Sequence, residues 1–135
     1  MRLIDANVFI YAAGGPHRYR TPSQRVFASV RDGSLEANTD TEVLQEILHY
    51  YRTRRDVGFG RRVFQQAVDA FPRPFEITVP MLKTAADTLA THPHLQARDA
   101  VHIGVLVDLG LEGIISADRG FDVVPGVTRF DPLEL

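Results

Sequence analysis

One stretch decides the fold of this chain: residues 96–118, which read QARDAVHIGVLVDLGLEGIISAD. Its first part, residues 96–109, carries apolar side chains on almost every face, which predicts a helix buried in the middle of the protein. Gly110 ends this helix, and residues 113–116 form a short apolar run that predicts a buried strand.

The rest of the chain alternates strands and helices in the same way. Apolar periodicity and turn residues predict further strands at residues 3–4, 35–38, 75–79 and 127–130. They predict further helices from an Asn7 N-cap to the break at Gly14, from a Thr21 N-cap to Asp32, from a Thr39 or Asp40 N-cap to Arg55, and over residues 59–71 and 80–91. This order implies an α/β fold with a mainly parallel central sheet flanked by helices, in a single domain over residues 1–135.

The composition narrows the class of protein and of chemistry. With 44% hydrophobic and 24% charged residues, the chain has the balance of an ordinary soluble globular protein. The absence of cysteine excludes disulfides, thiolate metal sites and cysteine nucleophiles, so any chemistry falls to carboxylates, histidines and hydroxyls. No segment has the length of a membrane span or the apolar core of a signal peptide, so we expect a cytoplasmic protein without membrane contact.

The charge pattern leaves nucleic-acid binding open. A net charge of -2 argues against a surface that is basic all over. The arginines nevertheless crowd into two groups, Arg18/Arg20/Arg25 and Arg52/Arg54/Arg55/Arg61/Arg62. Because the planar guanidinium suits phosphate oxygens, these groups fit phosphate binding, but they fit a solvated helix surface equally well.

Three aspartates occupy positions where a carboxylate can meet a ligand. Asp5 and Asp118 each follow a short apolar strand, and open α/β sheets bind ligands at the carboxyl ends of their strands. Asp99 lies in the first turn of the buried helix, where burial makes a carboxylate costly unless it has a partner such as a metal ion. We therefore expect Asp5 and Asp118 to share one crevice, and Asp99 to need a partner, for which a metal ion is suitable.

A fourth acid is expected from the helix that ends near Arg55, where the choice lies between Glu42 and Glu46. At 100° per residue, Glu42 points almost opposite the centre of the apolar stripe of this helix, whereas Glu46 lies roughly 130° away, on its flank. Glu46 is therefore the acid that we expect to reach inward over the rim of the core.

Several converging carboxylates repel one another unless cations neutralise them. Hard oxygen ligands, without cysteine or an ordered histidine motif, favour Mg²⁺, with Mn²⁺ as a substitute, over zinc. Two such ions about 4 Å apart would stabilise the attacking and leaving oxygens of a phosphoryl transfer. Taken singly, each acid also fits an ordinary capping or surface role, so the interpretation depends on the whole set.

Four motifs resemble those of PIN-domain ribonucleases, and most closely those of the VapC toxins of bacterial and archaeal toxin–antitoxin pairs. The motifs are LIDANVFI at residues 3–10, VLQEIL at 43–48, RDAVHI at 98–103 and ISADRGFD at 115–122. They occur in the right order and at the right spacing over nearly the whole chain. The resemblance implies a PIN-like three-layer sandwich.

The resemblance also implies an activity, a site and partners. The activity is that of a Mg²⁺-dependent endoribonuclease that hydrolyses RNA with metal-activated water, and the implied catalytic metal ligands are Asp5, Glu46, Asp99 and Asp118. Asn7 and Ser116 are implied to hold the acids and waters in place. The implied partners, besides RNA, are a VapB-like antitoxin and a second copy of the chain.

This chain departs from the family pattern at one position. Many relatives carry a further acid two residues after the one that matches Asp118, and here Gly120 stands in its place. Two outcomes are compatible with this departure: Asp122 substitutes for the absent acid in supporting the site, or the second metal binds weakly.

Two other interpretations stay open. A catalytically silent PIN-like module would bind RNA or a partner protein without cutting, and the Gly120 departure is compatible with it. A receiver-like or phosphatase-like domain would use Asp5 as a phosphoryl acceptor, although Ala6 and Asn7 follow where such folds want a second acid. His102, one helical turn beyond Asp99, can orient a carboxylate or a phosphate, but a semi-buried histidine with satisfied hydrogen bonds is the commoner case.

Overall fold

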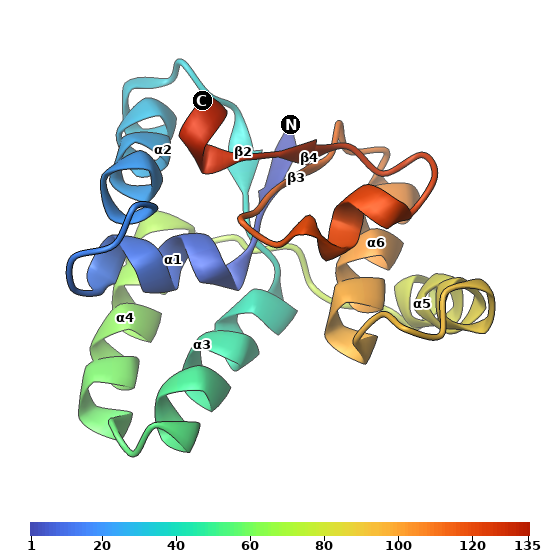
Figure 1. Ribbon diagram of the computed structural model, residues 1–135, viewed down its shortest axis with the longest axis horizontal. Helices are drawn as coiled ribbons and strands as arrows, with labels where there is room; N and C mark the ends of the chain where they lie inside the picture. Colours follow the sequence, from blue (N-terminus) through green and yellow to red (C-terminus); the bar gives the residue numbers. More distant parts are fainter.

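The computed structural model describes all residues 1–135 and centres on a four-stranded parallel sheet (Figure 1). Its strands, in spatial order, are β2 (Ala37–Asn38), β1 (Arg2–Ile4), β3 (Ile114–Ile115) and β4 (Arg129–Phe130). Leu3 pairs with Asn38 on one side and with Ile114 on the other, so the first strand of the chain lies inside the sheet. The predicted parallel sheet is confirmed.

Six helices flank the sheet. They are α1 (Ala6–Ala13), α2 (Arg20–Asp32), α3 (Thr41–Thr53), α4 (Val57–Ala70), α5 (Val79–Thr91) and α6 (Ala97–Leu109), with short 3₁₀ helices η1 (Arg119–Val123) and η2 (Pro132–Glu134). In Figure 1, α1 to α4 lie to the left of the sheet and below it, and α5 and α6 lie to its right. This layered α/β arrangement is the predicted fold class. None of the helices is both long and apolar enough to span a bilayer.

Two apolar cores form because successive strand residues point to opposite faces of the sheet. Ile4 and Ile115 pack in one core with residues of α1, α2, α3 and α4. Leu3 and Ile114 pack in the other core with residues of α5, α6 and η1. A strand buried on both faces has no polar alternation, which is why both central strands read as continuous apolar runs.

The buried helix predicted from the sequence is α6, and α5 packs closely along it. A Cβ atom on Gly104 would lie 2.3 Å from the carbonyl oxygen of Met81, so only glycine permits this approach. Gly110 ends the helix at a φ of 61°, as predicted. Burial stops earlier, because Val107 and Leu109 are exposed. The expectation of burial along the whole helix is therefore wrong for its last turn, since apolar side chains also occur at protein surfaces.

Two predicted N-caps are wrong. The cap of α1 is Asp5, whose carboxylate accepts a hydrogen bond from the backbone N–H of Ala6, and Asn7 lies inside the helix. The cap of α2 is Tyr19, which makes no side-chain capping bond, so Thr21 is also inside its helix. In α3 the open choice is settled in favour of Asp40, which accepts from the Val43 N–H at 2.8 Å.

Residues 75–79, predicted as a strand, do not form one. Phe75 makes a single bridge to Asp40, and the Ile77 N–H donates to the Thr41 hydroxyl at 3.2 Å. Thr78 then caps α5. The segment beside residues 75–79 turns into α3 after Asp40, so residues beyond Phe75 have no strand with which to pair. The alternation of apolar and polar residues therefore does not produce a strand here.

Candidate metal centre

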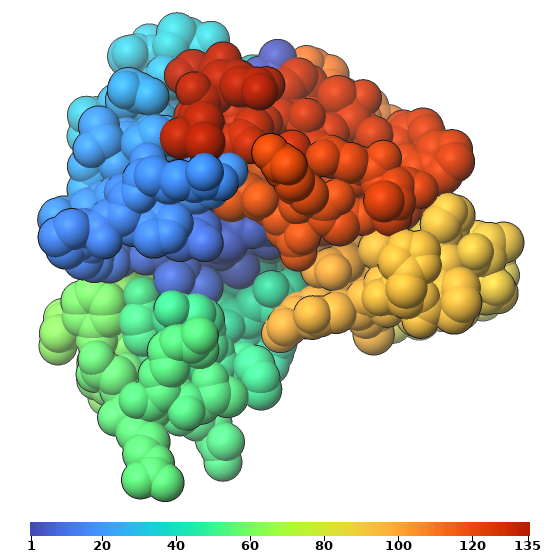
Figure 2. Space-filling view, viewed as in Figure 1, coloured from blue at the N-terminus to red at the C-terminus, as the bar shows by residue number.

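All four predicted carboxylates line one pocket, with a volume of about 500 Å³, at the carboxyl ends of β1 and β3. The four are Asp5, Glu46, Asp99 and Asp118. The rest of the lining consists of Ala6, Asn7, Ile10, Tyr11, His49, Tyr50, Thr53, Arg54, Gln96 and Arg98. α1, α3 and α6 supply most of this wall, and Figure 2 shows the surface notched between α3, in green, and the start of α6, in yellow-orange.

Asp5 is buried at the end of β1 and is held by hydrogen bonds on both oxygens. Its Oδ1 accepts from the Ala6 N–H at 2.6 Å. Its Oδ2 accepts from the Asn7 amide and the Ser116 hydroxyl, each at 2.5 Å. Burial nevertheless raises the pKa of Asp5 to about 6, because the charged carboxylate is poorly solvated there. Asp5 thus has a fixed orientation and an unfavourable charge.

Asn7 and Ser116 tie the ends of β1 and β3 together. The Asn7 amide nitrogen also donates to Ser116 Oγ at 2.9 Å, and its carbonyl oxygen accepts from the Ala117 N–H at 3.2 Å. Ser116 Oγ in turn accepts from the Asp118 N–H at 2.9 Å. One side chain from each strand end therefore positions the loop that carries Asp118.

Asp99, on α6, and Asp118, in the loop after β3, line the same pocket. Burial, and next the negative charge of Asp118, raise the pKa of Asp99 to about 6. Asp118 Oδ1 also accepts from the Gly120 N–H at 2.7 Å and so caps η1. The two carboxylates therefore repel each other when both are ionised.

Glu46 reaches the pocket from α3 and meets a fully buried histidine. His102 donates or accepts at both ring nitrogens, with Nε2 2.8 Å from Glu46 Oε1 and Nδ1 2.8 Å from Asp40 Oδ2. Burial disfavours the imidazolium, but Asp40 and Glu46 outweigh it and raise the pKa of His102 well above its usual value. The semi-buried histidine considered from the sequence is thus completely buried and has both nitrogens satisfied.

Asp40 is the residue that the sequence did not identify as part of this site. It reads as a helix cap, which it is, and no spacing links it to His102, which lies 62 residues further along the chain. Asp5, Glu46 and His102 together offer ligand atoms within 4.8 Å of one another, a separation that a metal ion can bridge. Glu42 does not line this pocket but a shallower hollow beside it.

Asp122 is not brought into the pocket. Its carboxylate binds Arg129, with Oδ1 2.7 Å from Nε and Oδ2 3.1 Å from Nη2, and it is 45% exposed. The same guanidinium donates to the Ser116 carbonyl oxygen at 2.9 Å. Asp122 therefore contacts the site only through Arg129, and it does not occupy the place of an acid at Gly120.

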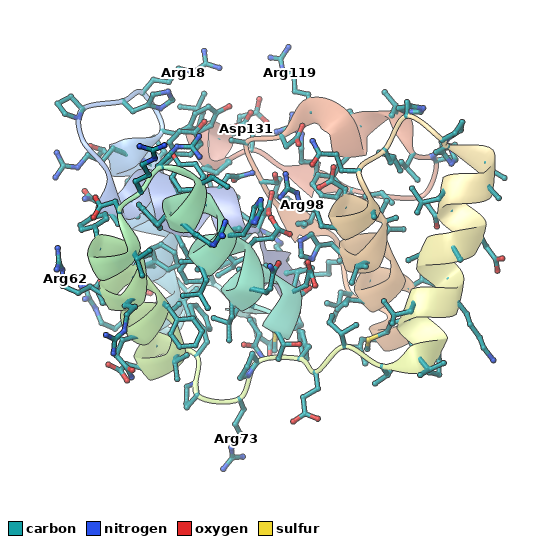
Figure 3. The ribbon with its side chains drawn as sticks, turned by 90° about the horizontal axis from the view of Figure 1, so that it is seen from below. Arg18, Arg62, Arg73, Arg98, Arg119 and Asp131 are labelled. Carbon is teal, nitrogen blue, oxygen red and sulfur yellow. The ribbon has the colours of Figure 1, made fainter.

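Only part of the arginine clusters reaches the acids. Arg54 is the member of these clusters that lines the pocket. Arg98, which belongs to neither cluster, also lines it, with Nε 4.0 Å from Glu46 Oε2. In Figure 3, Arg98 lies between α3 and α6, whereas Arg18 points outward at the top and Arg62 at the left edge of the molecule. The positive charge beside a ligand in the pocket would therefore come from Arg54 and Arg98 and not from the whole of the two clusters.

Comparisons with known proteins agree with this arrangement. The sequence model of the PIN domain matches residues 2–127. Ribonuclease VapC13 of Mycobacterium tuberculosis is 37% identical over 96% of this chain and 98% of its own length.

Two solved structures share the fold. The sarcin-ricin loop cleaving toxin VapC20 of M. tuberculosis superposes with a TM-score of 0.77, at 15% identity, over 95% of this chain and 97% of its own. A toxin–antitoxin complex from Klebsiella pneumoniae gives a TM-score of 0.68, at 15% identity, over 100% of both chains.

Proposed function

This chain belongs to the PIN-domain family, and from that premise we propose that it is an endoribonuclease that hydrolyses RNA phosphodiester bonds with Mg²⁺, or with Mn²⁺ in its place. The observation that carries the proposal is the convergence of Asp5, Glu46, Asp99 and Asp118 in one pocket. The names of the relatives, which are called ribonucleases, support it. The expected place of action is the cytoplasm, where RNA is available.

The donor set fits a divalent cation of this kind. The four proposed ligands are carboxylates, the hard oxygen donors that Mg²⁺ and Mn²⁺ accept. Burial, with a smaller contribution from neighbouring acids, raises the pKa values of Asp5 and Asp99, so a cation would offset the cost of their buried charges. When bound, it would supply positive charge for the phosphate and make a water molecule more acidic.

The protein itself supplies orientation around the acids. Asn7 and Ser116 fix Asp5, and Ser116 also fixes the backbone of Asp118. These bonds fix the Asp5 carboxylate and the backbone of Asp118, two residues from opposite ends of the chain, before any cation binds. This support is what we expect of residues that hold cation ligands in place.

The rim of the pocket suits a single RNA strand. Arg54 and Arg98 provide guanidinium groups for phosphate oxygens. Tyr11 and Tyr50 provide aromatic faces on which bases stack, although the Arg54 guanidinium now lies 3.5 Å from the centre of the Tyr50 ring. A flexible single strand reaches the acids more easily than a duplex does.

The products should carry a 5′-phosphate and a free 3′-hydroxyl. A cut that uses the ribose 2′-hydroxyl needs a base and an acid, usually histidines, and leaves a cyclic phosphate. His102, which is buried behind Glu46, has both ring nitrogens bound to carboxylates and is not available for that role. His49, the one histidine that lines the pocket, would have to act as base and acid alone, so the four carboxylates favour attack by water on phosphorus.

We further propose that the chain is the toxin of a VapBC-type pair, with a VapB-like antitoxin and a second copy of itself as partners. An apolar groove of about 410 Å³ lies between α1, α2 and α4 and includes Phe9, Phe27, Val63 and Ala67. A groove of this size suits an apolar segment of an antitoxin. Co-expression with the neighbouring gene and light scattering test both partners. Strict monomers without a copurifying partner would contradict them.

A cleavage assay tests the nuclease proposal. Purified protein should cut total RNA in Mg²⁺, EDTA should abolish the cut, and an RNA ligase specific for 5′-phosphate and 3′-hydroxyl ends should rejoin the fragments. Glu46→Gln should remove cleavage, whereas Glu42→Gln, on the same helix but outside the pocket, should keep it. RNA binding without cleavage would favour the silent module instead. Cyclic phosphate ends would refute the use of water.

A further inference from the structure

The site contains a buried pair that the proposed reaction leaves unused: Asp40 and His102. We propose that this pair is a positioning device, in which Asp40 holds His102 and His102 holds the Glu46 carboxylate ready for a divalent cation. The inference rests on the proposed metal-dependent function and assigns His102 as a positioning residue and not as a metal ligand.

The first support is the position of His102. Its side chain is 0% exposed, and each ring nitrogen is 2.8 Å from a carboxylate oxygen, Asp40 Oδ2 at Nδ1 and Glu46 Oε1 at Nε2. A ring held at both ends cannot rotate without breaking a buried hydrogen bond, which is costly where no water can replace it. The direction in which His102 presents Nε2 is therefore fixed.

The second support is that Asp40 is itself rigid. Its Oδ1 accepts from the Val43 N–H at 2.8 Å as the N-cap of α3, and its backbone bridges to Phe75. Its side chain is also 0% exposed, and its Oδ2 is the atom that meets His102. The start of α3, the helix that carries Glu46, therefore fixes Asp40 at one end of the hydrogen-bonded series Asp40–His102–Glu46.

The third support is that Glu46 has few other restraints. A glutamate side chain has three rotatable bonds, and this one is 12% exposed at the edge of the pocket. Its hydrogen bond to His102 uses Oε1, while Oε2 has only Arg98, at 4.0 Å. His102 is therefore the one short contact that selects the Glu46 rotamer.

The pair also links the two helices that supply acids. Glu46 lies on α3 and Asp99 on α6, and His102 is one turn beyond Asp99. The hydrogen bonds of His102 cross from α6 to α3, so they set the separation of Glu46 from Asp99 as well as its orientation. Loss of the pair should therefore weaken cation binding by the acid cluster without abolishing it.

A different role for His102 is conceivable on chemical grounds and becomes an outcome of the test. Histidines that bind metals commonly donate their other ring N–H to a carboxylate, as His102 can to Asp40. In this structure, however, His102 Nε2 faces Glu46 Oε1 at hydrogen-bond distance, so a cation on Nε2 would have to displace that bond. The geometry favours positioning.

The test measures Mn²⁺ binding to the purified protein without RNA, by titration calorimetry and electron paramagnetic resonance. The variants are Asp40→Asn, His102→Gln and the double variant. Asp40→Asn is informative because asparagine caps helices as well as aspartate does, so α3 should keep its start. The matched control is Val105→Ala, a buried change in the apolar part of α6 that weakens packing without touching the site.

We expect each single variant to raise the Kd for Mn²⁺ by about 10- to 100-fold, the usual effect of losing a partner that orients a ligand. The double variant should bind no more weakly than the weaker single one, because both act through Glu46. Saturating Mn²⁺ should restore RNA cleavage in the single variants. Val105→Ala should lower Tm and leave the Kd within about twofold.

Three results would overturn the inference. Wild-type-like Kd values in Asp40→Asn and His102→Gln would mean that Glu46 needs no such support. An equal loss in Val105→Ala would mean that general destabilisation explains the effect. Pulsed resonance that detects a directly coordinated imidazole nitrogen would make His102 a ligand. A wild-type protein that binds no Mn²⁺ would refute the proposed function as well, whereas the other results leave that function standing.

Discussion

At the strand ends of the pocket, Asp5 accepts three hydrogen bonds from Ala6, Asn7 and Ser116. On the helical side, Glu46 receives one short bond, from His102. We call Asp5, Asn7, Ser116 and Asp118 the strand-end half of the site, and Asp40, Glu46, Asp99 and His102 the helical half. Residues of the strand-end half are neighbours in the sequence or in the sheet, whereas those of the helical half meet only because α3 packs on α6. Substitutions in the two halves should therefore reduce activity for different reasons. In the strand-end half they remove local hydrogen bonds, and in the helical half they disturb the packing of α3 on α6.

The largest effect is expected at Asp99, a residue of the helical half whose charge is affected by Asp118 of the strand-end half. Asp99→Asn should reduce cleavage by about 10³-fold or more, because one of the proposed cation ligands is lost. In metal-free buffer at neutral pH it should also raise Tm, since burial and Asp118 make the Asp99 charge unfavourable. Asp108→Asn, at the exposed end of α6, should leave activity unchanged and raise Tm less than Asp99→Asn does, since it removes only an exposed charge near the end of the helix. A large fall in the Tm of Asp99→Asn would show a structural role.

A smaller loss is expected in the strand-end half on removing Ser116 Oγ. Ser116→Ala deletes the donor to Asp5 and the acceptor for Asn7 and Asp118. We expect Mg²⁺ affinity, measured by the Mg²⁺ dependence of cleavage, to fall about 10- to 100-fold. Ser23→Ala is a matched control, because Ser23 Oγ is buried and has no hydrogen-bond partner. Equal losses in both variants would contradict the role of Ser116.

The pH dependence of stability offers a third test. The folded-state pKa values of Asp5 and Asp99, about 6, lie above their ordinary value of 3.8, so the folded protein binds these protons more tightly than the unfolded chain does. Stability from these groups is therefore present at low pH and is lost as pH rises from about 4 to about 6. We expect the metal-free Tm to fall by about 5 °C between pH 5 and pH 6.5.

Mg²⁺ and Asp99→Asn serve as controls for that prediction. Mg²⁺ should flatten the pH profile, since the cation stabilises both charged carboxylates, whereas Asp99→Asn should make it shallower, since asparagine does not titrate but Asp5 still does. Differential scanning calorimetry at matched ionic strength measures this directly. A metal-free Tm that rises over the same range would contradict the raised pKa values.

The smallest effect is expected at Asp122, which contacts the site only through Arg129. Asp122→Asn should reduce cleavage by less than about fivefold, because the pair is partly exposed and such pairs contribute little. Kinetics with a short RNA would measure the change. A loss as large as that of Asp99→Asn would mean that Asp122 enters the acid cluster when a cation binds.

Much of the strand-end half was predictable from local sequence. Asp5 and Asp118 follow short apolar runs, and a parallel sheet brings the carboxyl ends of its strands together. Asn7 and Ser116 were expected beside them from the resemblance to PIN-domain motifs. Helix ends marked by glycine, such as Gly33 and Gly110, were predictable for a similar reason, because a left-handed residue there favours glycine. In each case the physical cause lies within a few residues.

Other features depend on segments that are distant in the sequence. Periodicity places Glu46 on the flank of α3, but its partner His102 and the anchor Asp40 meet only because α3 packs against α6. Asp122 turns to Arg129 because β4 lies beside β3, and residues 75–79 lack a strand because the chain beside them turns into α3. Local patterns determine where a helix or strand begins and ends and which of its residues lie on its buried face. Pairing and burial between distant elements determine which of those residues meet, because hydrogen bonds and charges act over a few ångströms of space whatever their separation along the chain.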